Sequence, residues 1–444
     1  MGWYKDINAI LEQEPETWLN YLHGQQLEHV PHLTRVNPML RGFFLRLAWH
    51  GMILLRHLTL RHPETLKAKA DYVVFAGSAN QMHSLDGTAN ALKDQGMRVV
   101  EIANGKLLHT EDQLARYIPL RLSFLDIVRS LVLLVKHGPS LYKELKTKHP
   151  AAIQVYFDSF CSVYSFLVYF RRILKQTKPD FVVTSNDHNS PNRAMLAVAH
   201  YLGVKTVYLQ HASISRLFPA LRVNYAFLDG QHALDIYREC DENQPERQRN
   251  VPEPQVFLTG QKKRLARADN RQTKAIGIAL NSLDDATSAI LLVKDLATRG
   301  QHLIVRLHPG QSERDTQQYL AAFEDDEHVK MSSPKTETVS DFLEEIRWMV
   351  AGNSSIHLEA VLAGVIPIYF ELTPPDSPDY YGYVRHGLAR KANSAADIVE
   401  LVKEQGGATE PNVEAIRYYS ATYLTKWDGR EGELVAQYLM KAVQ

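Results

Sequence analysis

Short, mostly apolar runs alternate with longer amphipathic stretches along most of this 444-residue chain. Runs such as Tyr-Val-Val-Phe at 72–75 have no polar break, which is typical of strands buried on both faces of a parallel sheet. A first series of strands is predicted at 72–75, 98–102, 181–184, 206–209, 225–228 and 256–259. A second series is predicted at 275–280, 303–305, 348–350 and 366–369. Strands that alternate with helices predict an α/β fold with parallel sheets.

Helical periodicity fills the segments between these runs. Helices are predicted at 84–95, 192–201, 284–298, 314–323, 356–362, 395–403 and 413–423. A long helical stretch from 122 to about 175 is predicted to break at Gly138-Pro139 and at His149-Pro150, because proline removes a helix hydrogen bond.

The length of the chain predicts two domains, because one hydrophobic core seldom holds so many residues. A polar, basic segment at 260–273 separates the two series of strands and marks the predicted boundary. We expect an N-terminal Rossmann-like domain with a helical N-terminal region at 1–262 and a second such domain at 273–425. A last helix, at 426–444, is expected to return to the first domain. Two doubly wound domains in tandem form a cleft, and ligands bind in such clefts.

Composition narrows the class of protein. Lys+Arg and Asp+Glu both number 50, so no global field attracts nucleic acid, and any preference for anions must come from local loops. The two cysteines, Cys161 and Cys240, are too few for a disulfide framework, and the first residues lack the pattern of a signal peptide. We therefore expect a cytoplasmic protein.

One apolar segment is also basic. Residues 41–62 combine Phe, Leu, Met, Ile and Trp with four arginines and contain no acidic residue, a composition that fits a helix resting on anionic lipid. Peripheral association with the inner face of the cytoplasmic membrane is therefore one interpretation. The alternative is a buried helix whose arginines reach out to water. A second apolar segment, 122–137, is interpreted as core.

Two stretches of the second series each follow an apolar run and precede a helical pattern: Arg306-Leu307-His308-Pro309-Gly310 and Ala351-Gly352-Asn353-Ser354-Ser355. Such loops gather on one edge of an α/β sheet, where backbone N–H groups and small hydroxyls bind phosphate. Pro309 disfavours the α conformation at His308, so the imidazole is expected to project beyond the strand end. The alternative is an ordinary polar loop residue.

The second stretch offers a turn and two hydroxyls. Gly352 permits a sharp turn, and Asn353 and Ser354 are good N-cap residues, so either can simply cap the next helix. Ser355 adds a second hydroxyl. Glu359, one turn along, is either a partner for ribose hydroxyls or a solvated carboxylate.

These two stretches resemble the C-terminal half of GT-B glycosyltransferases of bacterial surface-polysaccharide assembly. The His-Pro and Ser-Ser pairs are similar to those of bacterial sialyltransferases and Kdo transferases, which use CMP-activated sugars, and of CDP-glycerol polymerases. The resemblance covers about 275–370 and implies that His308, Pro309, Ser354 and Ser355 contact the nucleotide phosphate or the donor. The stretch from Gly352 to Pro367 also resembles sugar-nucleotide epimerases and UDP-dependent GT-B enzymes, so the base stays open.

The predicted donor-binding set extends this group to neighbouring polar residues. Lys262, at the domain junction, is expected to neutralise phosphate, although a charged linker is commonly just solvated. The full set is Asn281, Lys262, Arg306, His308, Pro309, Gly310, Gly352, Asn353, Ser354, Ser355 and Glu359.

Candidate catalytic groups follow strands of the first series. Sugar transfer needs a base for the acceptor hydroxyl or a carboxylate that attacks the anomeric carbon, and Asp187 fits either role. The alternative is that Asp187 or Asn189 caps the next helix. Asp229 is a rival carboxylate that a turn would equally explain, and His211 is expected to bind donor phosphate or carboxylate or to pair with Asp187.

The loop at 77–83 has too few glycines for a dinucleotide fingerprint and is interpreted as an acceptor-side loop. The predicted acceptor-side residues are Ser78, Asn80, His83 and His188. The acid pairs at 284–285 and 325–326 do not follow apolar strand ends, so neither a metal nor a resident cofactor is expected.

The resemblance, together with these candidate residues, implies a GT-B-like glycosyltransferase of capsule or lipopolysaccharide synthesis. The expected donor is CMP-Kdo or CMP-sialic acid, and the expected acceptor is a growing oligosaccharide or glycolipid. The alternatives are a sugar-nucleotide epimerase or hydrolase, a CDP-glycerol-type phosphotransferase, and a polysaccharide-binding module without catalytic activity.

Overall fold

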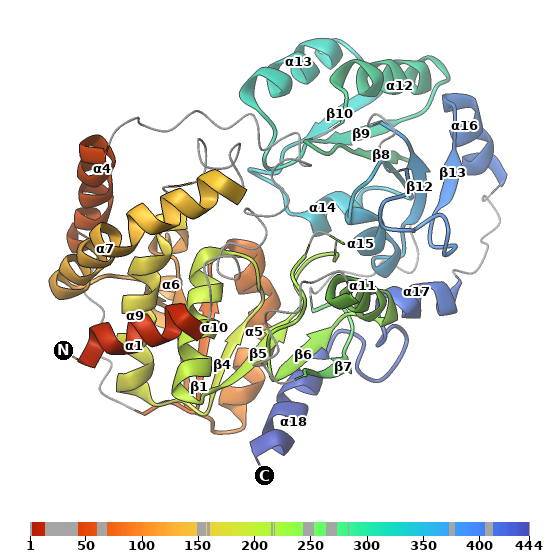
Figure 1. Cartoon of the computed structure of the whole chain (residues 1–444). Helices are drawn as coiled ribbons and strands as arrows, with labels where there is room; N and C mark the ends of the chain where they lie inside the picture. Colours follow the sequence, from red (N-terminus) through yellow and green to blue (C-terminus); the bar gives the residue numbers. More distant parts are fainter. Residues whose placement is uncertain are drawn as a thin grey trace. The chain divides into compact units, whose positions relative to one another are not determined.

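The computed structural model describes residues 2–13, 43–59, 69–148, 157, 160–214, 216, 218–242, 253–262, 273–282, 284–372, 378–404 and 412–443. The chain divides into two compact units, residues 1–263 with 426–444 and residues 264–425 (Figure 1). Each unit contains one parallel sheet with helices, so the predicted α/β class is confirmed. Within the described ranges, no helix is long and apolar enough to cross a membrane. The predicted cleft stays a prediction.

The sheet of the first unit has seven strands in the order β3-β2-β1-β4-β5-β6-β7, and each neighbouring pair is parallel. The strands are β1 (Tyr72–Ala76), β2 (Val99–Ala103), β3 (Ile118–Pro119), β4 (Phe181–Thr184), β5 (Lys205–Leu209), β6 (Tyr225–Leu228) and β7 (Gln255–Leu258). Succession along the chain changes direction between β1 and β4. This pair is therefore the switch point, where ligands of open α/β sheets bind.

Helices cover both faces of this sheet. They are α1 (Gly2–Gln13), α4 (Phe43–Leu55), η3 (Arg56–Thr59), α5 (Ala79–Asp94), η4 (Gly105–Leu107), α6 (Glu111–Arg116), α7 (Phe124–Lys148), α9 (Val163–Thr177), α10 (Ser190–Leu202), α11 (Gln231–Glu242) and α18 (Glu431–Val443). The last helix, α18, packs on α5, and its Val435 and Leu439 are buried in one cluster with Val74 of β1. The C-terminal helix thus completes a buried cluster of the first unit.

The sheet of the second unit has six parallel strands in the order β10-β9-β8-β11-β12-β13. The strands are β8 (Ile276–Ala279), β9 (Leu303–Arg306), β10 (Val329–Ser332), β11 (Trp348–Ala351), β12 (Ile366–Phe370) and β13 (Arg390–Ala392). Its helices are α12 (Ala286–Thr298), α13 (Glu313–Phe323), α14 (Val339–Glu344), α15 (Ile356–Leu362), α16 (Ala395–Glu404) and α17 (Val413–Tyr419). The switch point lies between β8 and β11.

Three details of the sequence-based assignment were wrong. Helix α7 continues through Pro139, because Leu133, Leu141 and Leu145 on both sides of the proline are buried in one core. Helix α5 begins at Ala79 rather than near 84, since the hydroxyl of Ser78 accepts from Gln81 N and caps it. Segment 122–137 is not simply core: Phe124, Leu125, Val128, Val132 and Val135 are exposed.

Candidate functional site

At the switch point of the second unit, a hydrogen bond joins the loop after β8 to the loop after β11. Asn281, after β8, donates from Nδ2 to the carbonyl of Asn353, after β11, at 3.0 Å. The strand register places Ala279 opposite both Arg306 and Ala351, so the loops after β8, β9 and β11 begin at one level of the same sheet edge. These loops contain most of the predicted donor-binding residues.

His308 follows β9 and is exposed, together with Pro309 and Gly310. The backbone N–H of Gly310 donates to Nδ1 of His308 at 3.0 Å. Because that nitrogen accepts, a neutral ring carries its proton on Nε2. Desolvation lowers the pKa of His308 below the ordinary value of a histidine, which favours this neutral form. The imidazole is thus prepared as a single N–H donor at the strand end.

The two serines after β11 differ in their local roles. Ser355 is the N-cap residue of α15, yet its side chain makes no capping hydrogen bond. The hydroxyl of Ser354 accepts a long hydrogen bond from Ile356 N, at 3.5 Å. The expected cap at Asn353 or Ser354 is therefore displaced by one or two residues. Both serines are half-buried, and the Ser355 hydroxyl is not needed to hold its helix.

Asn353 positions the loop instead. Its Oδ1 accepts from the hydroxyl of Tyr369 at 3.2 Å and from the backbone of Tyr380 at 2.8 Å. Gly352, before it, lies close to the backbone of Phe370 and Leu372. The loop after β11 is thus tied to the segment after β12.

Arg306 and Glu359 are both buried, which the sequence did not indicate. The guanidinium of Arg306 donates to Ser332 Oγ and to the Glu337 carbonyl, each at 2.9 Å. Burial lowers the pKa of Arg306, while the charges of Glu337, Asp341 and Glu359 counteract this. The interpretation of Glu359 as a solvated carboxylate was wrong, because the helix that carries it packs against the sheet.

His357 is a residue of this site to which the sequence assigned no role. Its ring is fully buried beside Tyr369 and Tyr383, and Nε2 donates to the carbonyls of Ala351 and Gly352 at 3.2 and 3.0 Å. Burial lowers its pKa to about 4, although the two carbonyls counteract this. The neutral ring of His357 thus holds the start of the loop that carries the two serines by hydrogen bonds to its backbone.

The switch point of the first unit is held by two amides that the sequence did not single out. Oε1 of Gln81 accepts from the backbone of Gly77, after β1, at 2.7 Å and from Asn192 at 3.3 Å. Asn192 also donates to Oγ1 of Thr184, at the end of β4, at 2.6 Å. Amides at these positions carry no pattern that sequence reasoning could use, since their role depends on β1 and β4 being neighbours.

The predicted acceptor-side residues lie at several places around this switch point. Ser78 caps α5. Asn80 and His83 are exposed and lie in the first turns of that helix, so the expected loop is largely helical. His188, after β4, is engaged at both ring nitrogens, with Asp187 and Asn186, each at 3.1 Å.

Asp187 lies at the centre of a buried polar network. Its Oδ1 faces the ring of His188, and its Oδ2 accepts from the hydroxyl of Tyr237 at 3.3 Å. That hydroxyl also lies 3.1 Å from the hydroxyl of Tyr208. Burial and the charge of Asp187 raise the pKa of both tyrosines, so they remain neutral donors. Below it, buried Arg193 donates to the Asp187 carbonyl at 3.2 Å.

Asp229 and Lys262 form a buried ion pair at the ends of β6 and β7. The ammonium of Lys262 lies 3.0 Å from Asp229 Oδ1 and also donates to the carbonyls of Phe227 and Gly260, at 3.2 and 3.0 Å. The view of Lys262 as part of a solvated linker was wrong, because it supplies the counter-charge of a buried carboxylate. Its three protons all have protein acceptors. His211, after β5, is half-buried.

In the part of the chain that the structure describes, no group of three or more His, Cys, Asp or Glu side chains could hold a metal ion. Asp285 caps α12 by accepting from Ser288 N at 2.8 Å. Metal independence stays a prediction.

Comparison with solved structures identifies the architecture. A UDP-N-acetylglucosamine 2-epimerase is 12% identical and covers 85% of this chain and 96% of its own, with a TM-score of 0.52. MnaA of Staphylococcus aureus, solved with UDP, is 12% identical, with coverages of 85% and 97% and a TM-score of 0.52. The calicheamicin glycosyltransferase CalG4 is 13% identical, with coverages of 84% and 98% and a TM-score of 0.50. The chain has a GT-B-like fold.

Because the sequence identities are only 12–13%, the similarity to these structures is one of fold alone. No protein-family model matches the sequence, and no curated protein matches it. The His-Pro and Ser-Ser resemblance, and the CMP-sugar donor it implies, therefore stay predictions.

Proposed function

We propose that this chain is a nucleotide-sugar-dependent glycosyltransferase whose second unit binds the donor through His308, Ser354 and Ser355. One observation carries the proposal. Next to the switch point, the neutral imidazole of His308 presents an N–H, and the Ser355 hydroxyl is not used as a cap. The strands that carry them, β9 and β11, flank β8, which puts their ends about 10 Å apart, two interstrand spacings.

Phosphate is the ligand chemistry that suits these groups. An imidazole N–H and two hydroxyls donate to phosphate oxygens without bringing a full positive charge. The charged residues first expected to help, Arg306 and Lys262, have protein acceptors instead. MnaA, which shares the fold, was solved with UDP.

The first unit would hold the acceptor, with Asp187 as the group that receives the proton of the acceptor hydroxyl. Asp187 follows β4 at the switch point, whereas Asp229 is already neutralised by Lys262. His188 and Tyr237 would orient the Asp187 carboxylate. We further propose Kdo or sialic acid from the CMP-linked donor as the transferred sugar, and a capsule or lipopolysaccharide glycan as the acceptor. The site of action would be the inner face of the cytoplasmic membrane.

A sugar-nucleotide epimerase or hydrolase is the second candidate, because the same phosphate-binding edge would serve it and a UDP-N-acetylglucosamine 2-epimerase is among the compared structures. It needs no glycan acceptor. Conversion of a UDP-sugar without added glycan would favour it over transfer. A CDP-glycerol-type reaction would instead require CDP-glycerol as the donor.

The test measures thermal unfolding with CMP, CDP, UDP and GDP, because a ligand that binds only the folded chain raises its apparent stability. We expect one nucleotide to give a clear shift in the wild type and none in His308→Ala. His302→Ala is the matched control, since His302 precedes β9 at the opposite end of the same strand and should keep the full shift. Absence of any nucleotide shift in the wild type contradicts the proposal.

A further inference from the structure

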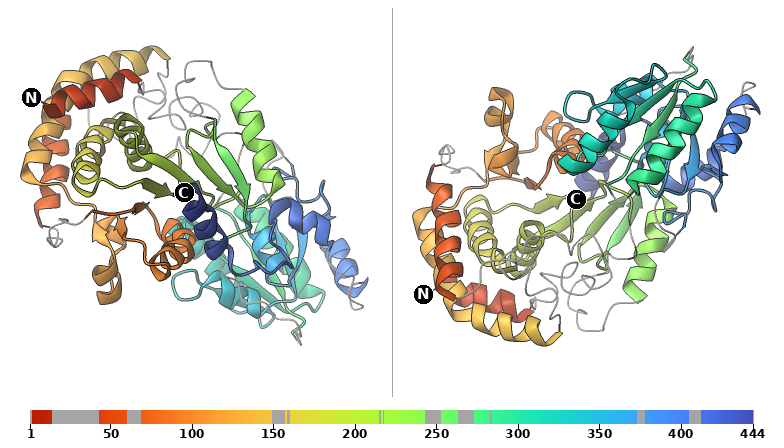
Figure 2. Two further views of the ribbon diagram at one scale, coloured as in Figure 1. Left: turned by 90° about the horizontal axis from the view of Figure 1, so that it is seen from below. Right: turned by 90° about the horizontal axis from the view of Figure 1, so that it is seen from above.

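Two neighbouring helices of the first unit expose apolar lines that no described element covers. On α4 and η3 the exposed apolar side chains are Phe44, Leu45, Met52, Leu55 and Leu58. On α7 they are Phe124, Leu125, Val128, Val132, Val135 and Tyr142. The two helices pack beside each other at the rim of this unit (Figure 2). We call these residues together the α4–α7 surface.

The spacing along α7 makes a single stripe. Leu125, Val128, Val132, Val135 and Tyr142 follow one another at intervals of three, four, three and seven residues, so they lie along one side of the helix. At 1.5 Å per residue this stripe is about 26 Å long. Phe124 is 66% exposed and Leu125 53%, which is costly in water for an apolar stripe of this length.

The charges around the surface are mainly basic. Residues 43–59 contain Arg46 and Arg56 and no acidic residue. Arg46 lies over the rings of Phe157 and Tyr142, at 5.0 and 5.9 Å, and so joins α4 to α7. Asp126, the acidic residue in the first turn of α7, is buried in an ion pair with Arg172 at 2.8 Å. An apolar stripe bordered by arginine and lysine complements an anionic interface.

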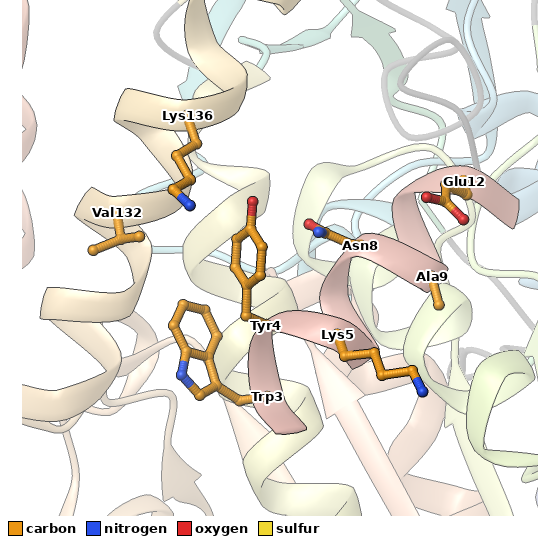
Figure 3. A pocket seen from close by; sticks show the side chains of 8 residues that line it. All are labelled: Trp3, Tyr4, Lys5, Asn8, Ala9, Glu12, Val132 and Lys136. Atoms are coloured by element: carbon orange, nitrogen blue, oxygen red, sulfur yellow. The ribbon is translucent and has the colours of Figure 1, made fainter. Parts of the chain in front are cut away.

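A pocket of about 760 Å³ adjoins the stripe, between α1 and α7. It is lined by residues of α1 and α7 that include two lysines and one glutamate: Trp3, Tyr4, Lys5, Asn8, Ala9, Glu12, Val132 and Lys136 (Figure 3). The ammonium of Lys136 lies 4.6 Å from the ring centre of Tyr4, and the guanidinium of Arg129 lies 5.4 Å from that of Trp3. Tryptophan and tyrosine favour the level of lipid headgroups. Lysines beside them would bind a headgroup phosphate.

We propose that the α4–α7 surface docks on the anionic face of a phospholipid bilayer, with the apolar stripe at the acyl boundary and the α1–α7 pocket at a headgroup. The proposal extends the expected contact of segment 41–62, of which 43–59 is described, to α7, which the sequence had assigned to the core. It does not depend on the reaction that the chain catalyses, so either can fail without the other.

The test is co-sedimentation with phosphatidylcholine vesicles that contain or lack phosphatidylglycerol. We expect the full chain to bind the anionic vesicles, to bind the neutral ones much less, and to be released by salt. The double variant Leu125→Gln/Val132→Gln should weaken binding by about tenfold or more, because two inserted side chains become polar. Leu291→Gln/Leu320→Gln is the matched control, since both leucines are exposed in the second unit, and it should bind like the wild type.

The contribution of charge is tested by Lys136→Glu, and Lys294→Glu, at an exposed lysine of α12, is the matched control. Only Lys136→Glu should lose binding to anionic vesicles.

Three outcomes overturn the proposal: no sedimentation of the wild type, equal binding to neutral and anionic vesicles, or unchanged binding of the α7 double variant. A wild-type dimer that the α7 double variant dissociates, without vesicle binding, assigns the surface to a second copy of the chain instead. Nucleotide-induced stabilisation should be the same in all four variants, which separates this test from that of the proposed function.

Discussion

Ser355 and Ser312 precede helices of the second unit in the same way along the chain, and their hydroxyls do different things. Ser312 accepts from the backbone of Asp315 at 3.1 Å and caps α13. Ser355 occupies the N-cap position of α15 with αR backbone angles, and its side chain makes no such bond. The Ser312 hydroxyl therefore stabilises the fold as a helix cap. The Ser355 hydroxyl makes no capping hydrogen bond and lies at the sheet edge where the strands end, so it is available to a ligand.

This difference gives the first prediction. Ser312→Ala should lower the free energy of unfolding by about 1 kcal/mol, as loss of a cap usually does, and leave nucleotide binding unchanged. Ser355→Ala should leave stability nearly unchanged and weaken nucleotide binding by about tenfold, the effect of one lost hydrogen bond to a charged group. Denaturant unfolding and calorimetric titration check the pair. Equal nucleotide affinities of the two variants would contradict the proposed donor site.

The buried His357 gives a prediction about pH. Burial lowers the pKa of His357 to about 4 in the folded chain. In the unfolded chain the same side chain has a pKa near 6.5, so between these two pH values it is protonated in the unfolded chain and neutral in the folded chain. The free energy of unfolding therefore falls as the pH falls from about 6.5 to about 4, by on the order of 3 kcal/mol from this residue. Unfolding of His357→Gln across this range should show a smaller slope. A slope as steep as that of the wild type would rule out His357 as its source.

Some site residues could be predicted from the sequence and others could not, for a physical reason. His308, Ser354 and Ser355 follow apolar strands directly, and the carboxyl ends of parallel strands share one edge. The surroundings of a charged side chain depend instead on partners distant in sequence. Lys262 is buried because Asp229 lies 33 residues earlier on the adjacent strand end, and no local pattern contains that pairing.

At the scale of elements, the central strands and the edge strand β7 were predicted from the sequence, whereas three other edge strands were missed. Strands β1, β4, β8 and β11 are buried on both faces, so each is a continuous apolar run. The missed strands β3, β10 and β13 lie at or near sheet edges, where one side meets solvent. Their sequences, Ile-Pro, Val-Lys-Met-Ser and Arg-Lys-Ala, lack the apolar signal because their exposed positions can be polar.

At the contact between α5 and α18, two glycines differ in the space that is available for an added Cβ. A Cβ on Gly432 would lie 2.4 Å from the backbone carbon of Gly87 and 2.7 Å from Thr88 N, so the helices would have to separate. A Cβ on Gly87 would meet only the Cα of Gly432, at an ordinary 3.6 Å. This contact between α5 and α18 therefore has space for a methyl group at Gly87 but not at Gly432.

We therefore expect Gly432→Ala to lower the free energy of unfolding by about 1–3 kcal/mol, the usual effect of overpacking. Gly87→Ala should be neutral or slightly stabilising, because alanine favours the helix by up to about 1 kcal/mol over glycine. Denaturant unfolding of both variants measures the difference. Equal destabilisation by the two substitutions would mean that the crossing is looser than this geometry requires.

At the scale of the whole molecule, the two units have separate buried clusters and differ in which parts of the chain build them. The second unit is a continuous segment, 264–425, whereas the first unit is completed by 426–444. The buried clusters respect this division: Val435 and Leu439 join residues of β1 and β4, while Ile276, Val305 and Trp348 join one another. Separate cores allow the two units to unfold in separate steps.

Gly277 makes this separation measurable. A Cβ at this position of β8 would lie 2.4 Å from Ile346 and 2.7 Å from Phe342, so Gly277→Ala overpacks the second unit alone. We expect calorimetry to resolve two transitions, of which Gly277→Ala lowers one. The nucleotide that binds the wild type should raise that same transition, by about 2.7 kcal/mol at a hundredfold excess over its dissociation constant, and leave the other in place. If nucleotide raised the transition that Gly277→Ala does not move, the donor site would lie in the first unit, and the roles proposed for His308 and Ser355 would be excluded.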